Sequence, residues 1–196
     1  MSEEHKPLPW RHISQASNAA LRYIDGRRKG EIKSLSTPWK KFNNISMGGI
    51  EWQTITTIAG MSGSGKTAIL GQLETGLKDL NQTDDFAILS FNFEMLSSRL
   101  IGRKLSNKMN ITTQQLYSAS ETFTLNDNYY MNAVQEARKL NKYDINYVDL
   151  PGNVKSLEAT ILAFAKDKDK PVIVMLDHTL LVKKAGGAQD RDLLYD

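Results

Sequence analysis

The chain of 196 residues contains no cysteine. Disulfide bonds and thiolate metal sites are therefore excluded, which fits a reducing compartment. No apolar run approaches the roughly 20 residues of a membrane-spanning helix, and the first residues, MSEEHKPLP, lack the apolar core of a secretion signal. We therefore expect a cytoplasmic protein with no membrane among its partners.

The excess of positive over negative charge is also small, with 25 lysines and arginines against 22 aspartates and glutamates. The formal net charge of +3 is too small to indicate nucleic-acid binding by itself. Residues 22–41 are locally basic, but a solvated linker explains such a stretch as well as a nucleic-acid surface does. A chain of this length suits one domain and can bury roughly 70% of its unfolded surface, so its core does not depend on disulfides or metals.

One glycine-rich motif stands out, GMSGSGKT at residues 60–67. It matches the phosphate-loop pattern G-x-x-x-x-G-K-[ST] in full. The glycines let the backbone turn tightly and direct N–H groups at phosphates, the lysine reaches the same phosphates, and the threonine hydroxyl can ligate Mg²⁺. The nucleotide-binding residues predicted by this motif are Gly60, Met61, Ser62, Gly63, Ser64, Gly65, Lys66, Thr67 and Ala68.

The flanking residues provide the context that such a loop requires. Residues 54–59, TITTIA, form a strand-like run, and residues 68–80 place aliphatic side chains near one helical face. A plain glycine-rich turn between a strand and a helix is the structural alternative. The context on both sides favours a site for a nucleoside triphosphate with Mg²⁺.

Strand and helix patterns alternate along the rest of the chain and predict an α/β fold, a mainly parallel sheet with helices on both faces. Later strands are expected at residues 86–91, 145–148 and 172–176, the last buried on both faces. Helices are expected at residues 14–28, 95–109, 127–140 with a cap at Asn126 or Asp127, and 154–166, and a short helix is expected within residues 112–122. Residues 31–49 are expected to be irregular, and the charged residues 166–170 to form a solvated turn.

Two carboxylates are predicted at the carboxyl edge of the sheet, where open α/β sheets bind ligands. Asp177 ends the apolar run VIVMLD, a Walker B pattern, and can hold the Mg²⁺ shell through water. Glu94 follows another strand and can orient or deprotonate an attacking water, although a helix dipole favours an acid there for structural reasons alone. Lys66 and Glu94 are the predicted catalytic residues, and Thr67 and Asp177 the predicted metal ligands.

Three further side chains lie close to these in sequence. His178 follows Asp177 and can reach a γ-phosphate, but a single histidine there is more often structural. Lys183 and Lys184 precede a glycine pair and can form either a loop facing nucleic acid or a solvated loop.

Several segments resemble the RecA-like motor domain of DnaB-type replicative helicases. Residues 20–32 and 36–42 are similar to the family's linker helix and its G-E-I…T-G-[FY]…L lead-in, with Pro38 where the family usually has glycine. LSFNFEM, followed by residues 99–103, is similar to the family's S-L-E-M…R segment. YVD with the later PG pair is similar to the third strand and its turn, and DHTLL stands where the family shows D-Y-L-Q-L.

This resemblance implies a RecA-like P-loop fold, ATP and Mg²⁺ as cofactors, Glu94 as the catalytic glutamate and Arg103 as a functional arginine. It implies a replicative helicase that couples ATP hydrolysis to translocation on single-stranded DNA. The partners implied are single-stranded DNA, further copies of the chain in a hexameric ring, and primase or a helicase loader.

The resemblance also sets the expected domain organisation: a tail at residues 1–13, a linker helix at 14–30 and a partial RecA-like ATPase domain at 31–196. In the family the sensor strand, the main DNA-binding loop and the arginine finger come after the Walker B strand. We therefore expect a fragment of a longer gene product, with weak or no ATP hydrolysis by itself.

Two other functions stay open. A RecA-type recombinase or a clock-type ATPase has the same fold, and filaments on DNA in place of closed rings would indicate the recombinase. A non-catalytic nucleotide-binding assembly or loading factor needs no catalytic glutamate, so it would tolerate the loss of Glu94.

Overall fold

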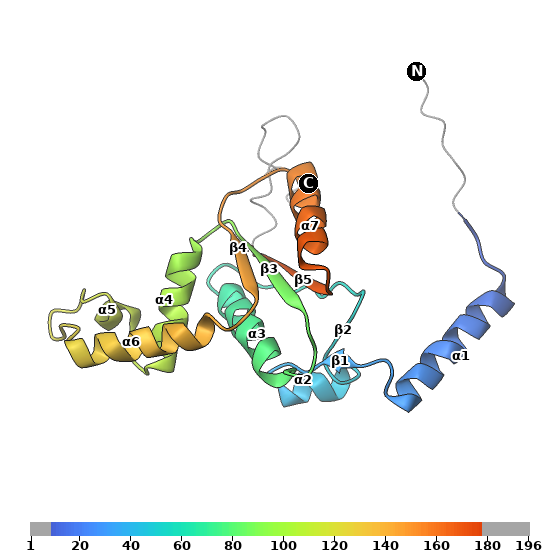
Figure 1. Ribbon diagram of the computed structural model, residues 1–196, viewed down its shortest axis with the longest axis horizontal. Helices are drawn as coiled ribbons and strands as arrows, with labels where there is room; N and C mark the ends of the chain where they lie inside the picture. Colours follow the sequence, from blue (N-terminus) through green and yellow to red (C-terminus); the bar gives the residue numbers. More distant parts are fainter. Residues whose placement is uncertain (1–8, 178–196) are drawn as a thin grey trace, which may run out of the picture. The chain divides into compact units, whose positions relative to one another are not determined.

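The computed structural model describes residues 9–177. They fall into two compact units that divide after Ile55, and each unit is described by itself (Figure 1). None of the helices within the described range has the length and apolar character of a membrane-spanning segment.

The first unit contains one long helix, α1, which spans Ile13–Lys29. It begins with a capping box, in which His12 Nδ1 accepts from the backbone of Ser14 at 3.2 Å and Gln15 Oε1 accepts from the backbone of His12 at 3.1 Å. It ends at Gly30, whose φ of 73° is left-handed, and its last turn is basic, which suits the negative end of the helix dipole. The helix predicted for residues 14–28 is confirmed.

The segment that we expected to be irregular, residues 31–49, contains a two-residue strand and a short helix, so that prediction is wrong for them. β1 (Ser34–Leu35) pairs antiparallel with β2 (Ile50–Glu51), and the helix α2 (Lys40–Ile45) lies between them in sequence. Gly49 permits this pairing because a Cβ at that position would overlap the carbonyl of Leu35. Elements of two to six residues are too short to give a readable hydrophobic period.

The second unit is built on a three-stranded parallel sheet with the order β4-β3-β5. The strands are β3 (Ala87–Asn92), β4 (Ile145–Val148) and β5 (Val172–Asp177). Every residue of the central strand β3 is buried, as expected for a strand with helices over both faces. The predicted positions of these three strands are confirmed.

Five helices connect and cover the strands. They are α3 (Lys66–Leu80), α4 (Ser97–Lys108), α5 (Thr113–Leu116), α6 (Asp127–Leu140) and α7 (Val154–Lys168). Asn126 caps α6 by accepting from the backbone of Tyr129 at 3.0 Å. Figure 1 shows α3 and α7 on opposite sides of the sheet. The predicted α/β class, with a parallel sheet and helices on both faces, is therefore confirmed.

Two predictions about strands are wrong. Residues 54–59 are irregular and not a strand, and the side chain of Ile55 is 95% exposed. A strand needs a neighbour for its backbone hydrogen bonds, and no segment within residues 9–177 provides one there. β5 is only partly buried, because Val174 is 40% exposed. β5 forms an edge of the sheet in the part of the chain that the structure describes.

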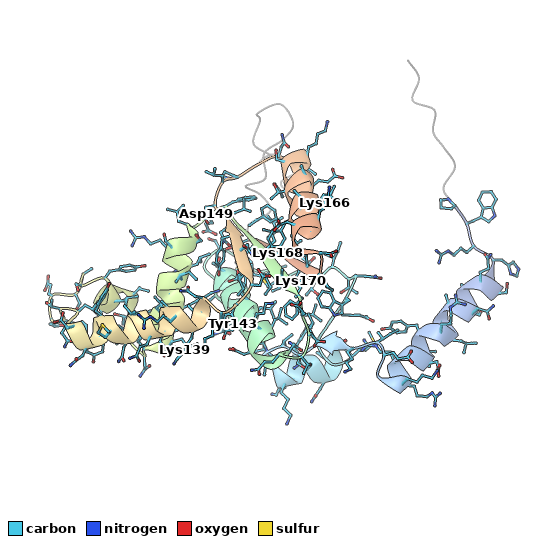
Figure 2. All side chains as sticks on the ribbon, in the orientation of Figure 1. Lys139, Tyr143, Asp149, Lys166, Lys168 and Lys170 are labelled. Atoms are coloured by element: carbon cyan, nitrogen blue, oxygen red, sulfur yellow. The ribbon has the colours of Figure 1, made fainter. Side chains whose placement is uncertain are left out.

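The charged residues after α7 are not a free solvated turn, so that prediction is also wrong. The helix continues to Lys168 and is capped by Asp169 with a left-handed φ of 47°. Lys168 and Lys170 (Figure 2) each place Nζ 3.0 Å from a different carboxylate oxygen of Asp144, and Lys170 also lies 2.9 Å from Asp85. These ion pairs tie the start of β5 to the segments that precede β3 and β4.

Candidate functional site

The glycine-rich loop before α3 leaves its backbone open to solvent. Gly63 and Gly65 have left-handed φ angles of 75° and 92°, and no other atom lies within 4 Å of the position that a Cβ would take on either. α3 begins at Lys66 with Gly65 as its N-cap and without a side-chain cap. The free N–H groups of the first turn and the positive end of the helix dipole are therefore available to an anion.

Lys66 lies over this loop. Its Nζ donates to the carbonyl oxygens of Gly60 at 2.8 Å and Met61 at 2.9 Å. A charged phosphate oxygen is a stronger acceptor than a neutral carbonyl. The ammonium group can therefore exchange these carbonyls for phosphate oxygens without leaving the loop.

Thr67 and Asp177, the two predicted metal ligands, lie in direct contact. Thr67 Oγ1, in the first turn of α3, donates to Asp177 Oδ2, at the end of β5, over 2.8 Å. Hydroxyl and carboxylate oxygens are ligands that suit Mg²⁺. The described residues contain no cluster of three or more acidic or histidine side chains arranged around a metal position. Phosphate oxygens and water would therefore supply most of an octahedral magnesium shell.

Glu94 lies at the same edge of the sheet. It comes two residues after Asn92, whose partner in the sheet register is Asp177. Glu94 is exposed, and its carboxylate makes no hydrogen bond or ion pair within residues 9–177. No hydrogen bond or ion pair joins it to Lys66 or Asp177 in the same range. Its carboxylate is accessible to water, as a general base requires.

The structural alternative for Glu94 does not apply, because the residue does not belong to a helix. It lies in a bend, and α4 begins three residues later, at Ser97, with no acid in its first turn. The helix N-terminus is capped instead by Asp149, from the end of β4 (Figure 2), which accepts from the Ser97 backbone at 2.9 Å and from the Ser97 hydroxyl at 2.7 Å. No local pattern in the sequence indicates this long-range cap.

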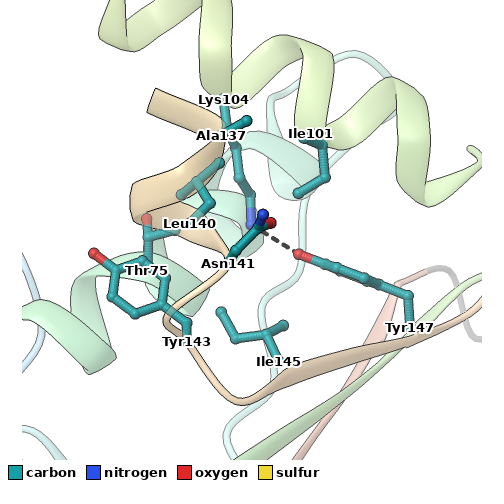
Figure 3. A pocket seen from close by; sticks show the side chains of 9 residues that line it. All are labelled: Thr75, Ile101, Lys104, Ala137, Leu140, Asn141, Tyr143, Ile145 and Tyr147. Carbon is teal, nitrogen blue, oxygen red and sulfur yellow. Dashed lines mark hydrogen bonds between the residues drawn. The ribbon is translucent and has the colours of Figure 1, made fainter. Parts of the chain in front are cut away.

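A buried polar cluster behind the sheet edge was also missed. Glu74 of α3 is 3% exposed. Its Oε1 accepts from Ser90 Oγ at 2.6 Å, and its Oε2 accepts from the Tyr147 hydroxyl at 3.1 Å and forms an ion pair with Lys104. Lys104 Nζ also donates to the Tyr147 hydroxyl over 3.3 Å (Figure 3). Burial, together with the negative charge of Glu74, raises the pKa of Tyr147. The only sequence signal for this cluster is Glu74 itself, an acidic residue among the aliphatic residues of the predicted helix.

A pocket of about 360 Å³ lies on the outer side of this cluster. Figure 3 shows its lining residues: Thr75, Ile101, Lys104, Ala137, Leu140, Asn141, Tyr143, Ile145 and Tyr147. None of the predicted site residues lines it. The chemistry predicted from the sequence therefore belongs to the open sheet edge and not to this pocket.

Arg103 is exposed on α4, and its side chain forms no hydrogen bond or ion pair with the predicted site among residues 9–177. His178, Lys183 and Lys184 lie outside the described residues.

The chain is similar to a known protein family and to solved structures. The family profile of the DnaB-like helicase C-terminal domain matches residues 34–193, a range that includes the loop, Glu94 and Asp177. No curated protein sequence matches the chain. One solved structure of an ATPase domain is similar, with a TM-score of 0.65 and 20% identity over 88% of this chain and 61% of that chain.

A solved DnaB-like replicative helicase, described with its interactions with primase, is also similar, with a TM-score of 0.64 and 20% identity. That match covers 88% of this chain and 41% of that one. The chain thus spans less than two thirds of the length of either structure. At this identity the likeness shows the fold.

Proposed function

The chain belongs to the DnaB-like helicase C-terminal domain family, and from this we propose that it is part of the motor of an ATP-driven replicative DNA helicase. The observation that carries the proposal is the Thr67 to Asp177 hydrogen bond of 2.8 Å. It places the last residue of the phosphate loop against the carboxylate of the Walker B strand. This pairing is what a site for a magnesium-bound triphosphate requires.

The phosphates would be bound by the backbone of the loop, the first turn of α3 and the ammonium group of Lys66. Thr67 Oγ1 and Asp177 would hold Mg²⁺, the threonine directly and the aspartate through water. A bound magnesium ion would neutralise charge on the phosphate oxygens. The same hydroxyl can donate its proton to Asp177 and present a lone pair to the metal.

Glu94 would orient the attacking water and accept its proton. The position of Glu94 supports this role, because it lies two residues after Asn92, the register partner of Asp177. Its carboxylate is also exposed, with no hydrogen bond or ion pair within the described range. A carboxylate with no ion-pair partner keeps its acceptor capacity for water. Glu94 therefore suits catalysis better than a structural role.

We infer that the motor translocates on single-stranded DNA as a ring of identical subunits, with six as the expected number. The family match supports this inference. The structural likeness to a DnaB-like helicase described with its primase interactions supports primase as a partner. Residues 14–30 would act as the linker helix and residues 31–196 as part of the ATPase domain.

ATP binding and DNA-stimulated hydrolysis test the proposal when both are measured on the full-length protein. Lys66→Ala is expected to abolish ATP binding. Glu94→Gln is expected to keep ATP binding and to lower kcat about 10² to 10⁴-fold. Glu158→Gln, an exposed glutamate on α7, serves as the matched control and should leave both unchanged.

Hydrolysis that single-stranded DNA does not stimulate, together with no unwinding of a forked duplex, would refute the helicase assignment. If Glu94→Gln left the function in cells intact, the protein would be a non-catalytic nucleotide-binding assembly or loading factor. Filaments on DNA in place of rings would indicate a recombinase.

A further inference from the structure

Asn92, the last residue of β3, contains a buried amide nitrogen with no hydrogen-bond partner in the part of the chain that the structure describes. The residue is 4% exposed. Its Oδ1 lies 3.2 Å from Ser90 Oγ, whose single proton points to the closer Glu74 Oε1 at 2.6 Å, and the amide nitrogen has no partner within the described residues. Buried donors are almost always paired in folded proteins, because an unpaired donor destabilises the fold. The free nitrogen therefore calls for a functional explanation.

The neighbour of Asn92 in the sheet is Asp177. The two residues are register partners on parallel strands, so their side chains project from the same face. Asp177 is 6% exposed, and its Oδ2 accepts from Thr67. Its Oδ1 accepts no hydrogen bond within residues 9–177. A free donor and a free acceptor thus project side by side from two adjacent strands.

The polar cluster around Glu74 lies next to the oxygen end of Asn92. Ser90 Oγ donates to Glu74 of α3, and Glu74 is bound in turn by Lys104 of α4 and Tyr147 of β4. Residues of β3, α3, α4 and β4 therefore form one hydrogen-bonded cluster that includes the Ser90 hydroxyl beside Asn92. The amide nitrogen of Asn92 takes no part in these hydrogen bonds and remains available to another acceptor.

We propose that Asn92 is a positioning residue for Asp177, whose free Oδ1 accepts from the Asn92 amide when a magnesium-bound nucleotide occupies the loop. Thr67 is the only donor to Asp177 within the described range, and the same hydroxyl is the predicted metal ligand. A second donor fixes the rotation of the carboxylate, so that it meets the metal's water shell in one orientation. This inference rests on the proposed function, because it requires Asp177 to serve Mg²⁺.

The test is a magnesium titration of nucleotide binding to the full chain, with a fluorescent ADP analogue as the probe. Asn92→Leu keeps most of the side-chain volume and removes the amide. It is expected to raise the magnesium concentration at half-maximal binding about tenfold, the change for one hydrogen bond to a charged acceptor. Binding of the analogue in EDTA should stay unchanged. The melting temperature should not fall, since the variant removes an unpaired buried donor.

A double-mutant cycle with Asp177→Asn separates this inference from the proposed function. If Asn92 acts through Asp177, Asn92→Leu has no further effect on the magnesium dependence once Asp177 is replaced. Asp177→Asn alone tests the metal role of Asp177. If that variant leaves the magnesium dependence unchanged, the proposed function fails. If Asp177→Asn alters the dependence and Asn92→Leu does not, only the role of Asn92 fails.

Asn146→Leu is the matched control. Asn146 lies on β4, its register partner is Leu89, and its side chain donates to Asp144 over 2.9 Å. It therefore projects from the face opposite to that of Asn92, and its variant should lower the melting temperature without changing the magnesium dependence. Asn92→Ala removes the amide without adding bulk and gives the same test if the leucine variant does not fold. An equal loss of binding with magnesium and in EDTA would also overturn the proposal.

Discussion

Thr67 donates a hydrogen bond of 2.8 Å to Asp177, although 110 positions separate the two residues in sequence. The bond joins the N-terminus of α3 to the carboxyl end of β5. It brings the two predicted metal ligands into contact in the protein alone, before any nucleotide is considered. The fold therefore prepares the site, so that binding does not have to bring these two elements together.

Thr67→Val tests the structural part of this pairing. The substitution leaves the nearly buried carboxylate of Asp177 without its donor, and we expect the free energy of unfolding to fall by about 1 to 3 kcal/mol. Urea denaturation without nucleotide measures the change. Thr160→Val is the matched control, because the Thr160 hydroxyl donates only to a carbonyl of its own helix, at 2.7 Å. An equal loss of stability in both variants would contradict the prediction.

Lys104→Met is expected to destabilise the second unit strongly. The side chains of Lys104 and Glu74 are 11% and 3% exposed, so the substitution leaves a buried carboxylate without its cation. We expect a loss of about 3 to 5 kcal/mol in urea denaturation. The double variant with Glu74→Gln should recover much of that loss, because both charges are then gone. A double variant no more stable than Lys104→Met would show that the ion pair does not govern stability here.

Asp144 should make stability sensitive to acid. Burial alone would raise its pKa, but hydrogen bonds from Lys170, Lys168 and Asn146 outweigh burial and lower the pKa to about 2. Because the folded-state pKa lies below the unfolded value of about 3.9, the stabilisation is present above pH 4 and is lost as the pH falls towards 2. The contribution is about 1 kcal/mol after solvent screening.

Urea denaturation from pH 6 to pH 2 measures this effect. The stability of the unmodified protein should decline more steeply in that window than the stability of Asp144→Asn. Parallel curves would rule out a contribution from Asp144.

Tyr143 should titrate at unusually high pH. Burial, followed by its hydrogen bond to Asp79, raises its pKa to about 12. The raised pKa stabilises the fold below pH 10, and this contribution is lost as the pH rises from 10 to 12. Tyr143→Phe should remove a late step in a spectrophotometric tyrosinate titration. Loss of an early step in the Tyr143 variant would contradict the assignment.

The parts of the fold that were predicted well from the sequence are those with strong local signals. α6 has its cap at Asn126 and a sustained helical period, and β3 is a short apolar run that is buried along its whole length. Both signals lie within one segment, so the segment alone determines the outcome.

The errors occur where the outcome depends on a distant partner. Residues 54–59 have the composition of a strand, but a strand forms only beside another strand that accepts its hydrogen bonds. Lys168 and Lys170 read as solvated charges, because Asp144 and Asp85 lie far away in sequence. The role of Glu74 was not predicted, because its partners Ser90, Lys104 and Tyr147 lie far from it in sequence.

The residues of the candidate site also fall into those with a local sequence signal and those that depend on a distant partner. The loop motif is local, and its glycines and Lys66 could be assigned from spacing alone. Asp177 could be placed at the right edge because parallel strands share their carboxyl ends. Asn92 gave no signal, since its unpaired nitrogen appears only when the two strands are aligned in register.

The cap that Asp149 provides to Ser97 has a consequence for Glu94. β3 ends at Asn92 and the capped helix α4 starts at Ser97. Glu94 therefore lies in a short connecting segment that is anchored at both ends. The length of this connecting segment limits how far the Glu94 carboxylate can reach. An inserted or deleted residue in the segment would therefore displace the carboxylate more than any substitution in α4.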